Sequence, residues 1–173
     1  LVDGVSTGAP IAFIVYNHDQ RPQDYDQLKE LYRPSHADFT YEARYGIRDP
    51  YGGGRASART TLSIVAAGAM AKLLLTSYKI SIFGYVTSIG PYSLPQDFTL
   101  ADPALIGLSP LSCPHEGTTQ TMLDHLHQLK TEGDTAGGII HCVIKGVPAG
   151  IGDPLFEKVQ GNLAKAMMCI NAV

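Results

Sequence analysis

The chain has 173 residues, enough for one domain with a substantial core. Its formal net charge of −3 argues against bulk nucleic-acid binding. Its three cysteines are too widely spaced for a disulfide framework or a zinc site, which favours a reducing compartment. We expect a single soluble domain over residues 1–173. No signal peptide is visible, and the most apolar run, 62–75, is too short to span a bilayer and contains Lys72.

The first third of the chain is predicted to hold one strand and two short helices. The apolar, β-rich run 10–16 is typical of a buried strand. A helix is predicted over 24–31, capped by its first residue, and Ser35 is placed to cap a second helix that ends at Gly46. A proline and three successive glycines then make 47–54 a loop.

The rest of the chain is dominated by a helix predicted from 57 to 78, whose centre is apolar on nearly every face. Such a helix is buried on most sides, so we expect other layers to cover it. A strand over 80–90 follows, with Gly84 marking a bulge. Elements do not alternate as βαβ units, which predicts an α+β fold with a buried helical layer. The other predicted elements are a helix, a strand and a helix, at 119–130, 139–147 and 156–169.

Arginine is confined to one part of the sequence. Five of the six arginines lie within 33–59, and none follows residue 60. The planar guanidinium grips carboxylates and phosphates through paired hydrogen bonds, which lysine does not offer. The cluster therefore indicates a site for a multiply anionic small molecule, with a solvated basic surface as the alternative. Asp38 and Asp49 lie in the same stretch and are candidates for catalytic carboxylates, turn caps or arginine partners.

The glycine-rich segment GGGRASAR (52–59) lies directly before the long helix. Glycines allow close backbone approach to a ligand, and a helix N-terminus offers unpaired N–H groups and partial positive charge. The segment lacks the Walker ending and does not match GxGxxG, so a nucleotide-binding module is a weak reading. Anion binding and a tight turn with an ordinary helix cap both remain open, with Ser57 as cap or ligand contact.

His36 is the histidine placed among these arginines. A histidine beside fixed cations and bound anions can serve as a proton donor near neutral pH. The alternative is a structural histidine. The other five have no comparable context and are interpreted as surface or structural residues: His18, His115, His125, His127 and His141.

Several ordered motifs resemble one known family. RPSHADFTYEARYGIRDPYGGGRASAR (33–59), followed by VAAGAMAKLLL, resembles the central signature of the chorismate synthases. The segments EGDTAGG, CVIKGVPAGIGDPLFEKV and LAKAMMCINAV resemble the second half of that family in the same order. The similarity covers essentially the whole chain.

The resemblance implies a β-α-β sandwich, with helices between two antiparallel sheets, assembled as a cytoplasmic homotetramer. It implies a carbon–oxygen lyase of the shikimate pathway of aromatic amino acid biosynthesis. This lyase makes chorismate by a 1,4-anti-elimination of phosphate from 5-enolpyruvylshikimate 3-phosphate. Reduced FMN is the implied cofactor, lending an electron transiently and taking it back, with NADP and a separate flavin reductase as candidates for its supply. The carboxylates and phosphate of the substrate account for the gathered arginines.

The resemblance also assigns flavin-binding residues. Arg55, Ala56 and Ser57 match the flavin-binding Arg-Ser-Ser of the family, with alanine in place of the middle serine. Asn171 and Ala172 match an Asn-Ala pair that also contacts FMN.

Catalytic and substrate roles follow by the same matching. His36 matches the histidine that protonates the reduced flavin near N1, and Ser57 is assigned to a proton relay as well. Arg55, Arg48 and Arg33 are assigned to the substrate. No metal is implied.

The sequence also departs from the family pattern. Thr60 and Ile64 stand where the family has glutamate and arginine four residues apart, the spacing of a helical ion pair. Because both partners are replaced, no orphan charge is left, which would cost about 3–5 kcal/mol if buried. The family's N- and C-terminal segments have no counterpart, so we expect a piece of a longer protein that does not turn over substrate alone. The alternative is a truncated or diverged scaffold of the same fold without catalysis.

Overall fold

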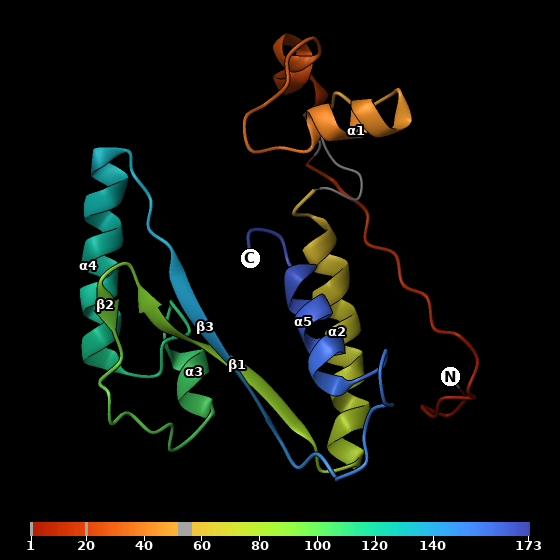
Figure 1. Ribbon diagram of the computed structural model, residues 1–173, viewed down its shortest axis with the longest axis vertical. Helices are drawn as coiled ribbons and strands as arrows, with labels where there is room; N and C mark the ends of the chain where they lie inside the picture. Colours follow the sequence, from red (N-terminus) through yellow and green to blue (C-terminus); the bar gives the residue numbers. More distant parts are fainter. Residues whose placement is uncertain (1, 20, 52–56) are drawn as a thin grey trace. The chain divides into compact units, whose positions relative to one another are not determined.

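The computed structural model describes residues 2–19, 21–51 and 57–173 (Figure 1). The chain divides into two compact units, Leu1–Thr61 and Leu62–Val173. That they form the single domain expected over 1–173 stays a prediction.

Two short helices lie within the first unit. The 3-10 helix η1 spans Pro22–Leu28, and α1 spans Asp38–Tyr45. The helix predicted over 24–31 therefore begins two residues earlier and winds more tightly. Pro22 at its first position explains the early start, because proline fixes φ near the helical value and lacks an N–H that the first turn would leave unpaired.

Helix α1 ends at the residue that the sequence predicts but begins later than predicted. Gly46 has a left-handed φ of 71° and donates its N–H to the carbonyl of Glu42, which closes the helix. The predicted cap Ser35 is wrong, because Ala37 occupies the cap position without a side-chain hydrogen bond. Ser35 instead lies in the preceding turn, with a φ of 58°.

The strand predicted over 10–16 is not formed. These residues have no regular secondary structure, and their side chains are exposed, Ile14 by 75% and Tyr16 by 73%. A strand needs a neighbour for its backbone N–H and C=O groups. Among the residues the structure describes, none is paired with this segment, so its β propensity is not realised.

Helix α2 spans Thr60–Ser77 and confirms the long helix predicted from 57 to 78. Its predicted burial is wrong for the described part of the chain: Val65 is 70% exposed and Leu73 is 76% exposed. The apolar composition that predicts burial is real, yet burial also requires covering layers, and the described elements bury none of the residues of this helix.

By length and composition alone, α2 also passes the test for a membrane-spanning helix, with a mean hydropathy of 1.4. One such helix indicates little, because core helices of soluble proteins have the same properties. Its 18 residues extend about 27 Å, slightly less than the roughly 30 Å of a bilayer core, and they include Lys72.

The second unit contains a three-stranded antiparallel sheet in the order β2-β1-β3. Its strands are β1, Ser81–Ile89; β2, Tyr92–Ser93; and β3, Gly138–Lys145. Both long strands confirm the predictions at 80–90 and 139–147.

The bulge in β1 lies three residues beyond the predicted one. Gly84 pairs regularly with Cys142, whereas the register shifts between Val86 and Ser88, so Thr87 is the additional residue. Its hydroxyl donates to the carbonyl of Ile139 at 3.2 Å. A bulge requires one unpaired residue. Glycine permits such a residue but does not force one, so Gly84 can keep the regular register.

Helix α4, Glu116–Glu132, packs against β2 and supplies much of the described core (Figure 1). Met122 is fully buried and Cys113, just before the helix, is 1% exposed. The helix predicted at 119–130 begins earlier because His115 caps it, its ring Nδ1 accepting from the N–H of Thr118 at 3.1 Å. Histidine is outside the usual set of capping residues, so the pattern missed this start.

Two further helices complete the second unit. Helix α3 spans Ala104–Leu108, and α5 spans Val159–Met168, within the helix predicted at 156–169.

Candidate functional site

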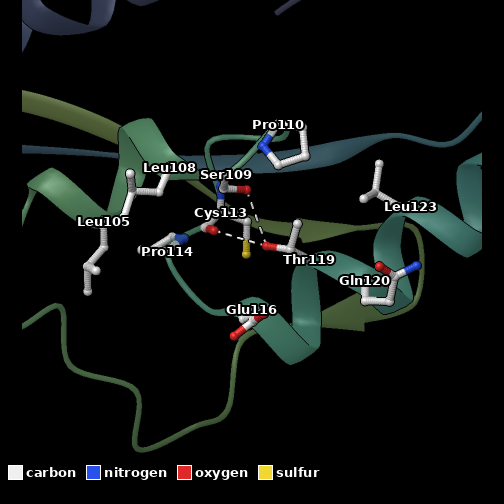
Figure 2. Close-up of a pocket in the computed structure, with 10 residues that line it drawn as sticks. All are labelled: Leu105, Leu108, Ser109, Pro110, Cys113, Pro114, Glu116, Thr119, Gln120 and Leu123. Carbon is white, nitrogen blue, oxygen red and sulfur yellow. Dashed lines mark hydrogen bonds between the residues drawn. The ribbon is translucent and has the colours of Figure 1, made fainter.

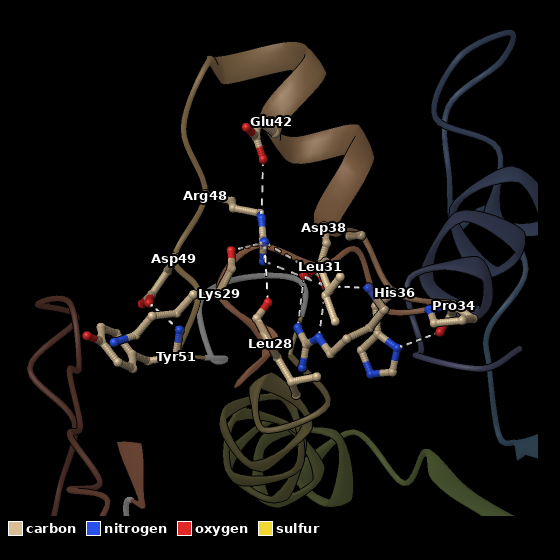
Figure 3. Close-up of polar contacts among 12 residues, drawn as sticks. Leu28, Lys29, Leu31, Pro34, His36, Asp38, Glu42, Arg48, Asp49 and Tyr51 are labelled. Atoms are coloured by element: carbon tan, nitrogen blue, oxygen red, sulfur yellow. Dashed lines mark hydrogen bonds and ion pairs between the residues drawn. The ribbon is translucent and has the colours of Figure 1, made fainter. Parts of the chain in front are cut away.

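Asp38 lies at the start of α1 (Figure 3). Its carboxylate binds Arg33. Arg33 donates from its backbone N–H and from Nε to Oδ2, at 3.0 and 2.8 Å, and from Nη2 to Oδ1 at 2.9 Å. The two side-chain bonds are the paired fork of an arginine–carboxylate contact, and the backbone bond fixes the main chain as well. Asp38 is 6% exposed, so this ion pair is shielded from water.

The same contact sets the electrostatics of the pair. Hydrogen bonding from Arg33 lowers the pKa of the Asp38 carboxyl far below its ordinary value, and outweighs burial, which acts in the opposite direction. Hydrogen bonding to Asp38 in turn raises the pKa of the Arg33 guanidinium. The positive charge of Arg48, whose Nη1 lies 3.9 Å from Asp38 Oδ2, makes a smaller contribution that also lowers the pKa of Asp38. Asp38 is therefore ionised throughout the physiological range and is a poor candidate for a general acid or base.

Arg48 joins the end of η1 to α1 (Figure 3). Its Nε donates to the Glu42 carboxylate at 3.2 Å, and its Nη2 donates to the carbonyls of Lys29 and Leu31. The guanidinium lies 5.4 Å from the ring centre of Tyr32. The Arg48 side chain is 9% exposed, so it behaves as an internal anchor.

Two of the three arginines assigned to the substrate are described, Arg33 and Arg48, and they differ in which donor atoms their described bonds leave available. The hydrogen bonds of Arg48 use Nε and Nη2, and its Nη1 lies near Asp38 in a nearly closed environment. Arg33 also uses Nε and Nη2, but its side chain is 23% exposed. Of the two, Arg33 is the one whose Nη1, unused among the described contacts, can be presented to a bound anion.

His36 is held in a tight turn just before α1. Its backbone N–H donates to the carbonyl of Arg33 at 3.3 Å, and its ring Nδ1 lies 2.9 Å from the carbonyl oxygen of Pro34. In this turn Pro34 occupies the second position and Ser35, with a left-handed φ, occupies the third, which is typical of a type II turn. A carbonyl oxygen only accepts, so Nδ1 carries the proton. The ring nitrogen left for chemistry is therefore Nε2, on an exposed side chain.

Ser57 lies at the entrance to α2. Its hydroxyl accepts from the N–H of Arg59 at 3.2 Å, and its carbonyl accepts from the N–H and the hydroxyl of Thr60. The side chain is half-buried. Its neighbours in the predicted flavin motif, Arg55 and Ala56, lie outside the described residues.

Asn171 and Ala172 follow the end of α5 in the second unit. Both are exposed, and Ala172 has a left-handed φ of 67°. The structure thus brings together His36, Arg33 and Arg48 in the first unit, whereas this pair belongs to the other unit.

A cavity of about 500 Å³ lies between α3 and α4 in the second unit (Figure 2). Leucines and prolines form much of its lining, together with Cys113 and Thr119. The Thr119 hydroxyl donates to the Cys113 carbonyl at 3.0 Å, so this polar group is already satisfied. None of the residues predicted for the site lines this cavity. Among the described residues, no group of three or more His, Cys, Asp or Glu side chains is arranged to hold a metal.

Asp38 and Glu42 are the carboxylates that bind Arg33 and Arg48. Asp38 is the arginine partner among the roles that the sequence left open for it, and Asp49 is a turn cap, accepting from the N–H of Tyr51 at 2.9 Å. Glu42 was missed. Its spacing of four residues from Asp38 puts both acids on one face of α1, and that was the available signal.

Comparison with a solved structure identifies the class of fold. The structure aligns with a crystal structure of chorismate synthase at a TM-score of 0.69 and 29% identity, covering 79% of this chain and 44% of that one. This likeness confirms the α+β class and the chorismate synthase type of fold. The chorismate synthase family profile matches residues 1–173. The chain belongs to the chorismate synthase family.

Curated relatives agree with the family profile. A chorismate synthase from Parabacteroides distasonis is 47% identical over 173 residues, 100% of this chain and 48% of the relative. One from Bacteroides thetaiotaomicron is 49% identical over 172 residues, 99% of this chain and 48% of the relative. One from Methanosarcina mazei is 47% identical over 176 residues, 100% of this chain and 47% of the relative. The chain thus spans about half the length of the curated relatives it matches.

Proposed function

We propose that the full-length chain carrying this sequence is a chorismate synthase. It eliminates phosphate from 5-enolpyruvylshikimate 3-phosphate to give chorismate in the shikimate pathway, with reduced FMN. The observation that carries the proposal is the family match over residues 1–173, at 44–49% identity to relatives of that name.

The described residues are chemically suited to a flavin and an anionic substrate. When bound, reduced FMN supplies transient electron donation to the substrate. His36 presents Nε2 from an exposed ring whose Nδ1 is already occupied, so one defined nitrogen is available to hold or deliver a proton. Asn171 and Ala172 are both exposed, and the side-chain amide of Asn171 offers a further polar contact. Arg55 and Ala56 belong to the same proposed flavin site but lie outside the described residues.

For the substrate, we assign different tasks to the arginines. Arg33 keeps Nη1 for a carboxylate or phosphate and carries its charge beside the His36 turn. Arg48 supports the site by holding η1 against α1, and Arg55 is retained as a substrate contact. The Ser57 hydroxyl, which accepts from Arg59, still has its own proton to donate in a relay.

The proposal extends to the assembly and its surroundings. The active form is a homotetramer in the cytoplasm, and a separate NADP-linked flavin reductase supplies reduced FMN.

An anaerobic assay tests this function. The full-length chain is incubated with reduced FMN and 5-enolpyruvylshikimate 3-phosphate, and phosphate and chorismate are measured together. Equal release of both products is expected. Absence of release, under conditions in which the Parabacteroides distasonis relative is active, would reject the proposal.

The second candidate, a scaffold without catalysis, is favoured by one observation: Thr60 and Ile64 replace the family's charged pair at the start of α2. A flavin titration of the full-length chain separates the two candidates. Saturable FMN binding supports the enzyme, and its absence together with absent phosphate release supports the scaffold.

A further inference from the structure

The loop 33–38 is closed by one buried side chain. Asp38 accepts the backbone N–H of Arg33 at 3.0 Å in addition to the two bonds from its guanidinium. The main chain is therefore tied at both ends of a six-residue segment, and His36 lies on the segment between the two ends.

His36 receives both of its described contacts from the tied end of this loop. Its backbone N–H bonds to the Arg33 carbonyl, and its Nδ1 bonds to the Pro34 carbonyl. The orientation of the imidazole, and which nitrogen carries the proton, thus depends on where two adjacent carbonyl groups point. The bond from the Arg33 N–H to Asp38 fixes the main chain at the peptide unit directly before those carbonyls.

The turn also needs external support. Ser35 adopts a φ of 58°, in the left-handed region that is unfavourable for a residue with a β-carbon. Such a conformation persists only when its surroundings impose it. The Asp38 contacts close the loop around Ser35 and supply that constraint.

From these contacts we propose that Asp38 is the positioning residue for His36. It does not act on a ligand itself, because it is 6% exposed and fully engaged with Arg33. It holds the turn so that the His36 ring keeps its proton on Nδ1 and presents Nε2. The expected effect on kcat rests on the proposed function, whereas the expected effect on the His36 tautomer does not.

The kinetic test is a double-mutant cycle in the full-length chain. Asp38→Asn removes the charge and one acceptor, and we expect kcat to fall about 10- to 100-fold, as for a misplaced reacting group. In a His36→Ala background the same substitution should lower kcat no further. A comparable additional loss in that background overturns the proposal, because a general structural defect would act whether or not the imidazole is present.

The structural test does not need activity. Long-range ¹⁵N spectra of histidine-labelled protein, with the His36 signals assigned by comparison with His36→Gln, report the tautomer. We expect a single Nδ1–H form in the parent and mixed tautomers in Asp38→Asn. A single unchanged tautomer in the variant overturns the proposal. If the parent releases no phosphate, the proposed function fails while this spectrum still decides the role of Asp38.

Two variants guard against simple misfolding. Asp26→Asn is the matched control, since Asp26 pairs with Lys29 at 2.8 Å on an exposed surface, and no bond between Asp26 and the turn is among the described contacts. It should leave both kcat and the His36 tautomer unchanged, and a loss equal to that of Asp38→Asn overturns the proposal. Should Asp38→Asn not fold, Asp38→Glu keeps the charge but displaces the oxygens by one methylene, and is expected to lower kcat and mix the tautomers.

Discussion

The imidazole of His125 lies against Gly90, so close that a β-carbon at residue 90 would stand 2.7 Å from its Nε2. Gly90 follows β1 with a left-handed φ of 55°, and His125 reaches it from α4. The Tyr92 ring meets the same imidazole edge to face, with ring centres 5.1 Å apart. The contact between α4 and the β1–β2 turn therefore requires a residue without a side chain at position 90.

We predict that Gly90→Ala destabilises the second unit through two separable effects. The left-handed backbone should cost about 1–2 kcal/mol, and the new methyl group must also displace the His125 ring. In a His125→Ala background only the backbone cost should remain. Urea denaturation of the four proteins of this cycle measures the difference in free energy of unfolding.

Gly133→Ala provides the backbone reference for that cycle. Gly133 ends α4 with a φ of 72°, and no atom of the described residues lies within 4 Å of a β-carbon placed there. Its substitution should cost only the left-handed conformation and should be independent of His125. If Gly90→Ala costs the same with and without His125, the close contact has no energetic weight.

A second prediction concerns the acid stability of the first unit. The pKa of Asp38 is lowered in the folded state, so the protein binds fewer protons there than the unfolded chain does. The resulting stability is fully present above the unfolded pKa of about 3.9 and is lost as pH falls towards the lower folded pKa. Urea denaturation followed at pH values from 6 down to about 2 should show this loss.

Asp38→Asn should remove that part of the pH dependence and lower the stability at neutral pH by about 3–5 kcal/mol, because Arg33 is left without its buried partner. Asp19→Asn is the comparison, since the Asp19 side chain is 84% exposed and its pair with Arg21 is open to solvent. An acid profile in Asp38→Asn that matches the parent would contradict the assignment.

A third prediction separates two arginines by their environment. Arg48→Lys keeps the charge but loses the fork that binds Glu42 and the carbonyl of Leu31 at the same time. We expect a loss of about 1.5–3 kcal/mol in the free energy of unfolding, the range for hydrogen bonds to charged groups. Arg21→Lys should change it by less than about 0.5 kcal/mol, since that side chain is 70% exposed. Equal effects of the two would show that Arg48 is not an anchor.

Local chemistry made some of the fold predictable. Gly46 ends α1 because glycine tolerates the left-handed cap, a property of one residue and its immediate neighbours. The burial of α2 could not be obtained in the same way, since it depends on layers that lie elsewhere, and Leu73 is exposed in the described part of the chain. The run 10–16 does not form the predicted strand for the same reason: a strand needs a neighbouring strand to pair with, and apolar composition does not supply one.

In the site, too, some features could be predicted from the sequence and others depend on the three-dimensional arrangement. Clustering of arginines was visible in the sequence, and the structure places Arg33 and Arg48 together around Asp38. Which donors remain free was not visible, because it depends on how Asp38 and Glu42 are directed by α1. The tautomer of His36 was likewise beyond the sequence, since it follows from the position of a single carbonyl, that of Pro34.

A fourth prediction concerns the replaced charge pair at the start of α2. Thr60→Glu combined with Ile64→Arg restores opposite charges four residues apart, with the acid nearer the helix N-terminus, where it also meets the helix dipole. The coupling between the two substitutions should be favourable by about 0.3–0.5 kcal/mol and should decrease in high salt. Thermal denaturation of the single and double variants measures it. A zero or unfavourable coupling would show that the geometry at this helix start does not support the pair.

The last prediction tests His36 as the proton donor of the proposed lyase. His36→Ala in the full-length chain should lower kcat by roughly 10²–10⁴, the usual contribution of a positioned general acid. Its exposed ring bonds only to the Pro34 carbonyl among the described contacts, so the thermal midpoint should change little. His18→Ala, an exposed histidine without a described side-chain bond, should leave kcat unchanged. Partial recovery of His36→Ala by added imidazole would assign the loss to the missing ring nitrogen, whereas an unaltered kcat would remove His36 from the chemistry.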